Sequence, residues 1–161
     1  MKSVLISIQP KWCELIASGK KTVEVRKTKP KLETPFKCYI YMTAGNASYP
    51  ATKNGAQYMC HNNGGKVVIG EFVCDRIFPI RVFNNGTIQD WNFNNLADSC
   101  VPYDDVVMYI GNNRNGYGWH ISDLVIYDRP KEIGDFKVRV ENKIWNFIKK
   151  LERPPQSWCY V

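Results

Sequence analysis

The apolar and polar positions at the start of the chain predict a strand followed by a short helix. Residues 3–8 form a β-prone apolar run. Trp12 then begins a stripe of apolar side chains at i, i+3 and i+4, which is the spacing of one helix face. Pro10 suits the first turn of a helix, where its missing N–H costs nothing, and Gly19 is a natural stop. We therefore expect a strand at 3–8 and a helix between Pro10 and Gly19.

The next segment, residues 21–28, alternates as a strand with two different faces. Successive side chains of an extended chain point to opposite sides, so Val23 and Val25 share one face. The opposite face carries a hydroxyl, a carboxylate and a guanidinium, which belong to Thr22, Glu24 and Arg26. Bulk water does not require three polar groups of different chemistry, so this strand is the first candidate for a functional surface.

Beyond residue 28 the pattern predicts further strands and three more helices. We expect strands at 36–44, 66–83 and 119–128 with a last one at the C-terminal end, and helices at 90–97, 103–110 and 140–151. Gly70 and Pro79 interrupt the strand at 66–83, and a bend at Gly70 suits a sheet that curls into a barrel. Residues 45–65 lack a sustained period, which predicts a surface insertion with room for one helical turn. About six strands with scattered short helices favour a small mixed β-barrel of the α+β class.

The composition indicates one soluble domain that spans residues 1–161. It is 44% hydrophobic and 23% charged, which is ordinary for a globular chain. No apolar run approaches the roughly 20 residues of a membrane span, and the N-terminal residues lack the long apolar core of a signal peptide. We therefore expect a cytoplasmic protein without membrane contact. The six cysteines contain no C-x-x-C pair, so we expect reduced thiols, no metal site and no cofactor.

Positive charge is concentrated near the N-terminus. Residues 1–40 hold nine Lys or Arg against three acidic residues, which is +6 of the total net charge of +7. A surface that binds a polyanion requires such an asymmetry, and nucleic acid is the partner that it favours. The alternative is a solvated basic face that only aids solubility.

The opening segment SIQPKWCELIASGKKTVEVRK, residues 7–27, resembles the signature of the ASCH domain family within the PUA-like superfamily. In that family a strand ends in S-I-x-P, a helix follows, and a G-x-K-T-x-E-x-R strand comes next. The segments GYGWHISDLVIYDRPKEI and RPPQSWCYV are similar to the C-terminal parts of compact ASCH proteins, which are often found in phage and prophage genomes. The resemblance covers nearly the whole chain apart from the insertion at 45–65.

The resemblance implies a PUA-like small mixed β-barrel with short peripheral helices and a cleft between the first helix and the barrel wall. Related folds bind RNA, or take a single and often modified base, in such a cleft. The polar face of the strand at 21–28 would then line a pocket. We therefore expect a monomeric module that binds RNA, another single-stranded nucleic acid or a modified nucleoside.

Within that cleft the residue types suit a nucleotide. Arg26 offers bidentate hydrogen bonds to a phosphate or a base edge, Glu24 about 7 Å away accepts from an exocyclic amine, and Lys21 brings a charge for phosphate. Aromatic rings stack on bases. The candidate ligand-binding set is Lys21, Thr22, Glu24, Arg26, Trp12, Trp119 and Trp158. The structural alternatives are an ordinary Glu24–Arg26 ion pair and core packing for Trp12.

Catalysis is left open. Some ASCH proteins are nucleoside amidohydrolases that use a Lys, a Thr and a Glu. Their Lys corresponds to Lys21, but the position of their Thr is Glu24 here, so the nucleophile is missing. Their Glu aligns with Glu71. Other ASCH proteins are ribonucleases, for which Lys21 with Glu24 or with His120 is a candidate acid–base pair. A further alternative is a phage-encoded module that grips a host protein, which exposed aromatic residues around 45–65 would favour.

Overall fold

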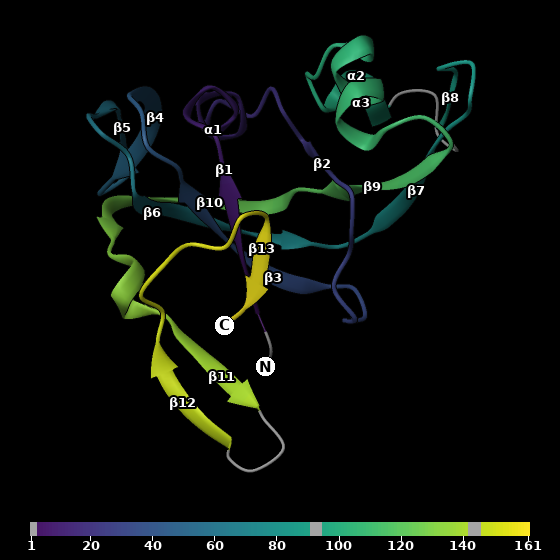
Figure 1. Cartoon of the computed structure of the whole chain (residues 1–161). Coiled ribbons are helices and arrows are strands. Elements are labelled where there is room, and N and C mark those ends of the chain that lie inside the picture. Colours follow the sequence, from purple (N-terminus) through teal and green to yellow (C-terminus); the bar gives the residue numbers. More distant parts are fainter. Residues whose placement is uncertain (1–2, 91–94, 142–145) are drawn as a thin grey trace.

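The computed structural model describes residues 3–90, 95–141 and 146–161, and strands dominate it (Figure 1). The five-stranded sheet has the order β10 (Ser122–Lys131), β6 (Val67–Cys74), β3 (Phe36–Met42), β1 (Val4–Ile8) and β13 (Trp158–Tyr160). Its strands pair antiparallel except for β1 and β3, which run parallel. A four-stranded antiparallel sheet has the order β2 (Val23–Arg26), β9 (Arg114–His120), β7 (Ile77–Val82) and β8 (Ile88–Asp90).

The remaining elements are two hairpins and a few short helices. The hairpins are β4 (Ala47–Lys53) with β5 (Ala56–Asn62), and β11 (Lys137–Glu141) with β12 (Asn146–Lys150). The helices are α1 (Pro10–Ala17), α2 (Asn95–Asp98), α3 (Tyr103–Ile110) and the 3₁₀ turn η1 (Ile133–Asp135). This confirms the mixed, sheet-dominated fold with short helices, although the described residues contain more strands than the six expected.

The core lies on both faces of the five-stranded sheet. Ile6 of β1 packs with Ile16 of α1 on one face, whereas Leu5 packs with Phe136 on the other. This alternation explains why every residue of β1 is buried. A separate cluster joins Val25 of β2 to α3, whose members are Val25, Ile80, Val82, Val106 and Ile110. Val25 of the predicted strand therefore packs against α3.

The strand predicted at 66–83 is two strands in two sheets. β6 ends at Cys74 and β7 begins at Ile77, so the chain changes sheet between them rather than at Gly70 or Pro79. Gly70 lies beside a register shift in the β3–β6 pairing, and a Cβ there would meet the Val125 carbonyl oxygen at 2.4 Å. The glycine therefore permits the close approach of β10.

Three helix predictions require correction. Of the helix predicted at 140–151, residues 140–141 and 146–150 belong instead to the β11–β12 hairpin, where Val138 and Val140 alternate with charged residues at the period of a strand. Residues 142–145 lie outside the described residues. Of the helix predicted at 90–97, residues 95–97 are helical as part of α2, residue 90 belongs to β8, and residues 91–94 lie outside the described residues. The insertion at 45–65 holds the β4–β5 hairpin and no helical turn. The helices at α1 and α3 are confirmed.

Two chemical features bear on the expectations for metal and membrane. All six cysteines are free thiols, and no group of His, Cys, Asp and Glu in the described residues is arranged to hold a metal ion. Burial raises the pKa of Cys74 to about 12 and that of Cys159 to about 11, so both stay protonated near neutral pH. Within 3–90, 95–141 and 146–161, no helix has the length and apolar character needed to cross a bilayer.

Candidate functional site

A cleft of about 460 Å³ lies between α1 and α3. The end of β1 and the polar face of β2 form its floor, α1 forms one wall, and α3 forms the other. It is lined by Ser7, Ile8, Gln9, Lys11, Trp12, Lys21, Glu24, Val25, Arg26, Thr43, Val101, Asp105, Val106, Tyr109 and Gln156. Three candidates from the strand at 21–28 and one from the first helix therefore share one concavity.

A buried ion network makes up the floor. Glu24 Oε1 lies 2.9 Å from Arg26 Nη2, and Glu24 Oε2 lies 3.2 Å from Lys21 Nζ. Lys21 is only 1% exposed, and its Nζ donates to the carbonyl oxygens of Val23 at 2.8 Å and Ser99 at 2.7 Å. Two cations and one carboxylate leave the floor with a formal charge of +1.

Arg26 connects the floor to the rest of the fold. Its Nη2 donates to the Ser7 carbonyl oxygen at 2.6 Å, and its Nη1 donates to Ser157 Oγ at 3.3 Å. The guanidinium therefore ties β2 to the end of β1 and to the C-terminal segment. Because Arg26 is only 7% exposed and held from three sides, its donors have a fixed direction.

Two polar atoms on the floor have no hydrogen-bond partner among the described residues. They are Glu24 Oε2, which contacts Lys21 only as an ion pair, and Arg26 Nε. Both atoms are buried, and buried polar groups are nearly always hydrogen-bonded in native proteins. Glu24 and Arg26, which both line the cleft, thus each keep one covered polar atom without a hydrogen bond in the part of the chain that the structure describes.

The walls add aromatic and charged groups. Trp12 is half-buried: it packs against the core and also lines the cleft, so core packing and exposure to the cleft occur together. Lys11 Nζ lies 4.4 Å and Lys21 Nζ 5.3 Å from the Trp12 ring. The opposite wall presents Tyr109 and the carboxylate of Asp105. The cleft therefore has an aromatic residue on each helix above a cationic floor.

The other sequence candidates lie elsewhere. Trp119 is fully buried and packs on Phe36 and Trp158 with ring centroids 5.9 Å away in both cases. Trp158 Nε1 donates to Thr28 Oγ1 at 3.1 Å, outside the lining of the cleft. Both backbone polar groups of Thr22 are hydrogen-bonded: its N–H donates to the Asp98 carbonyl oxygen, and its carbonyl oxygen accepts from the Ile121 N–H. None of the three lines the cleft.

His120 and Glu71 form separate polar clusters. His120 Nδ1 lies 2.5 Å from Asp75 Oδ1, and neither residue lines the cleft. Glu71 accepts from Lys37 Nζ at 2.6 Å and from the Tyr127 hydroxyl. Burial alone would raise the pKa of Glu71, but hydrogen bonds from Lys37 and Tyr127 outweigh it and hold that pKa below its ordinary value. The structure therefore does not bring either residue to Lys21.

Sequence reasoning did not predict the wall that α3 forms, nor the two glutamines, Gln9 and Gln156, that line the cleft. Asp105 and Tyr109 lie one helical turn apart on α3, so their shared face is readable, but the packing of α3 on Val25 is not. Gln9 lies between the first strand and Pro10, and Gln156 follows two prolines near the C-terminus. Such residues reach the cleft only through the tertiary fold, and no local pattern marks them.

Comparison with known proteins agrees with this architecture. Residues 6–73 match the ASCH domain family model. A comparison with curated protein sequences gives no match. The crystal structure of ASCH from Zymomonas mobilis is similar with a TM-score of 0.62 at 20% identity, over 99% of this chain and 87% of that one. A mutant form of that protein gives a TM-score of 0.61 at 19% identity, over 100% and 91% of the two chains.

The family match includes β1, α1 and β2, and hence the three charged residues of the cleft floor. The structural likeness extends beyond the matched segment to almost the full length of both chains. Residues 6–73 are therefore similar to the ASCH domain family, and the whole chain shares the fold of the Zymomonas mobilis ASCH structure.

Proposed function

We propose that this protein binds RNA or a free nucleotide by taking a single base, natural or modified, into the cleft between α1 and α3. The observation that carries the proposal is the pair of unsatisfied atoms on the floor, Glu24 Oε2 and Arg26 Nε. A carboxylate acceptor on Glu24 and a guanidinium donor on Arg26 are the two kinds of group that a base edge with a donor and an acceptor requires. Single-stranded RNA is recognised in this way, through unstacked bases whose edges are hydrogen-bonded.

The walls and the size of the cleft support the same ligand. Trp12 and Tyr109 supply rings from opposite helices, and a base stacked on an aromatic ring gains about 1–3 kcal/mol. Lys11 lines the cleft and is exposed, which suits a phosphate attached to the bound nucleoside. A volume of about 460 Å³ falls within the roughly 300–1,000 Å³ of small-molecule sites.

Family and charge point in the same direction. The ASCH domain family is generally associated with RNA binding. The basic residues of the N-terminal 40 positions include Lys11, Lys21 and Arg26, all of which line the cleft. By contrast, the protein-interaction alternative loses its expected feature, because Tyr49 is fully buried and Tyr58 half-buried in the β4–β5 hairpin.

Hydrolysis requires more than this floor offers. Lys21 Nζ is already held by two carbonyl oxygens and Glu24, and His120 does not line the cleft. Lys21 with Glu24 is the one acid–base pair of those predicted that lies together in the cleft. Turnover of an acylated cytidine or of labelled RNA, abolished by Lys21→Ala, would establish the hydrolase alternative.

The binding proposal is tested by calorimetric titration of the four ribonucleoside monophosphates into the wild type and Arg26→Gln. We expect saturable binding by the wild type, with a preference among the bases, and loss of at least tenfold in affinity for Arg26→Gln. The control is Arg76→Gln, which removes an exposed arginine that does not line the cleft and is expected to bind as the wild type does. Absence of binding, or equal binding by both variants, would refute the proposal.

A further inference from the structure

The β11–β12 hairpin projects from the body of the protein (Figure 1). Its two strands pair from Lys137 opposite Lys150 to Glu141 opposite Asn146. The hairpin joins the core at its base, where the Leu151 N–H donates to the Phe136 carbonyl oxygen at 2.8 Å and Phe136 is buried in the core. Most of the hairpin therefore faces solvent, although it belongs to the same chain as a compact core.

The hairpin is strongly basic. Residues 137–150 contain five Lys or Arg and one acidic residue, so this short segment carries +4 of the net charge of +7. Residues directly opposite each other in an antiparallel pair share a face. One face therefore holds Lys137, Arg139 and Lys150 together with Ile148, and all four side chains are exposed.

The pairing of these charges is unfavourable for the protein alone. Lys137 and Lys150 are direct cross-strand partners, and like charges in that position destabilise a hairpin. No ion pair joins either lysine to a carboxylate in the part of the chain that the structure describes. An isolated two-stranded hairpin is marginally stable even without such repulsion. An anionic partner that lies along this face would remove the repulsion.

We propose that this face of the β11–β12 hairpin binds the phosphate backbone of single-stranded RNA. Lys137 and Arg139 are two residues apart on β11, which spaces them about 7 Å along the strand, and Lys150 lies opposite Lys137. A polyanion could contact all three cations along this face. A second copy of this chain does not fit the face, because two hairpins of +4 would repel each other. This inference rests on the proposed function for the class of ligand but uses a separate surface.

Apolar side chains on the hairpin favour a single strand over a duplex. Ile148 is 64% exposed beside the cations, and Phe147 is 48% exposed on the opposite face. Surfaces that bind single strands combine cations for the backbone with apolar or aromatic groups on which unpaired bases stack. Duplex RNA offers no unpaired bases to such groups.

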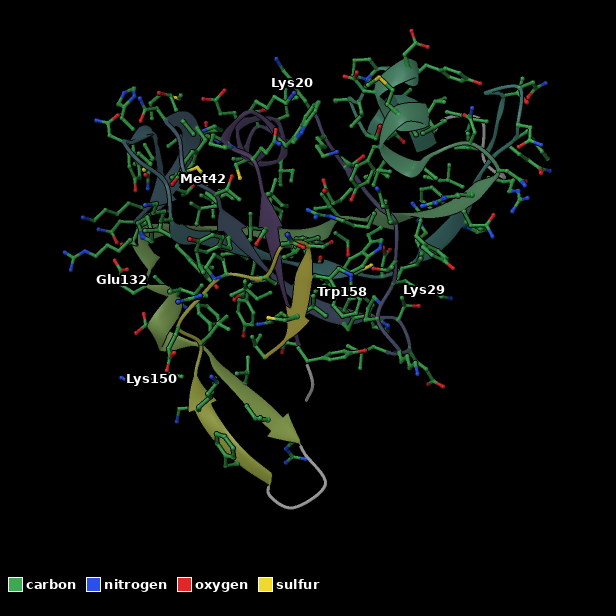
Figure 2. All side chains as sticks on the ribbon, viewed as in Figure 1. Lys20, Lys29, Met42, Glu132, Lys150 and Trp158 are labelled. Carbon is green, nitrogen blue, oxygen red and sulfur yellow. The ribbon has the colours of Figure 1, made fainter. Side chains whose placement is uncertain are left out.

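The hairpin and the cleft are far apart. Lys20, which follows α1 next to the cleft, and Lys150, which lies on the hairpin, are at opposite ends of the molecule (Figure 2). A mononucleotide in the cleft therefore cannot reach the hairpin, whereas a strand of some length is required to use it. Substitutions can therefore remove the proposed contact at the cleft and the proposed contact at the hairpin in separate variants.

The test compares two triple variants with the same net charge. The hairpin variant is Lys137→Gln/Arg139→Gln/Lys150→Gln, and the control is Lys53→Gln/Lys66→Gln/Arg76→Gln, which removes two exposed lysines and one exposed arginine elsewhere. Binding of an unstructured polyuridine of about 20 nucleotides is measured by fluorescence anisotropy over a series of salt concentrations. Circular dichroism and thermal unfolding of both variants verify that they are folded.

We expect the hairpin variant to bind polyuridine about tenfold more weakly at low salt, and the slope of log K against log salt to fall by about 2, because each phosphate contact contributes about 0.7. The control variant keeps the slope of the wild type. Equal slopes for the two variants, or a wild type that binds anionic lipid vesicles through the hairpin but not polyuridine, would overturn the inference.

The same titrations separate this inference from the cleft proposal. Mononucleotide binding that survives in the hairpin variant and is lost in Arg26→Gln supports the cleft, whatever happens to polyuridine. Hairpin-dependent polyuridine binding without any mononucleotide binding would leave the hairpin inference standing and remove the cleft proposal. A wild type that binds mononucleotides but not polyuridine at low salt would support the cleft proposal and overturn the hairpin inference.

Discussion

Glu24 and Arg26 form an ion pair of 2.9 Å in which both side chains are only 8% exposed. Strand alternation places the two residues on one face of β2, and the fold covers that face with α1, α3 and the C-terminal segment. An ion pair on an open surface would contribute little, but a buried one must be complete to be tolerated. The buried pair is therefore both a structural requirement of the fold and part of the binding surface that we propose.

The first prediction concerns the stability of this pair. Arg26→Gln leaves the buried Glu24 with Lys21 as its remaining cation, and we expect it to destabilise the protein by about 3 kcal/mol. The double variant Glu24→Gln/Arg26→Gln also removes the carboxylate that pairs with the buried Lys21, so we expect it to be less stable still. Urea unfolding measures both. A free energy of unfolding of Arg26→Gln within about 0.5 kcal/mol of the wild type would contradict the buried network.

The second prediction concerns stacking in the cleft. Trp12→Ala removes the ring of the α1 wall, and we expect nucleotide affinity to fall roughly tenfold or more, whereas Trp12→Phe retains most of it. Trp158→Phe serves as the control, since Trp158 does not line the cleft. Titration with the preferred monophosphate measures all three. Similar affinities for Trp12→Ala and Trp158→Phe would show that the base does not stack on α1.

Local patterns predicted the polar face of the strand at 21–28, and the resemblance to the ASCH family implied that this face lines a cleft. The alternation at 21–28 placed Glu24 and Arg26 on one face, and the helix stripe from Trp12 placed α1 directly before that strand. These are short-range relations, which period and capping residues encode. The same reasoning predicted α3 at 103–110, but it gave no sign that α3 would pack on Val25 and form the second wall.

The failures have physical causes as well. At 140–151 the apolar residues fit a helical stripe, but Val138 and Val140 also fit the period of a strand, and β11 pairs with β12. Trp119 and Trp158 were predicted to contact a ligand, yet they pack on each other instead. An aromatic residue near a motif is equally compatible with core and cleft until the strand register is known.

The third prediction follows from the lowered pKa of Glu71. A carboxylate whose folded pKa is below its unfolded value of 4.5 contributes stability above that value, and the contribution is lost as the pH falls towards the folded pKa. Glu71→Gln removes this contribution, so we expect a smaller loss of stability between neutral pH and pH values below 4.5. Thermal unfolding over that range measures it. Glu33→Gln, at an exposed position, is the control. A pH dependence equal to that of the wild type would show that Glu71 does not contribute.

The fourth prediction concerns the close approach of β6 and β10. In Gly70→Ala the new Cβ would lie 2.4 Å from the Val125 carbonyl oxygen, which belongs to the backbone and cannot rotate away. We expect a loss of about 1–3 kcal/mol, the usual cost of overpacking. Gly134→Ala is the matched control, because nothing lies within 4 Å of its Cβ position. Equal unfolding midpoints for the two variants in urea would contradict the strand spacing.

The decisive measurement for a base bound between α1 and α3 is a ¹H–¹⁵N NMR titration with the preferred ribonucleoside monophosphate, in which the shifts of the tryptophan indole N–H resonances are followed. Trp12 lines the cleft and Trp119 is fully buried outside it, so each acts as a reporter of position. We expect a saturable shift of the Trp12 indole resonance, little change of the Trp119 resonance, and no shift of either resonance in Arg26→Gln. An unchanged Trp12 resonance at a nucleotide concentration that saturates binding would place the ligand elsewhere and contradict the proposal.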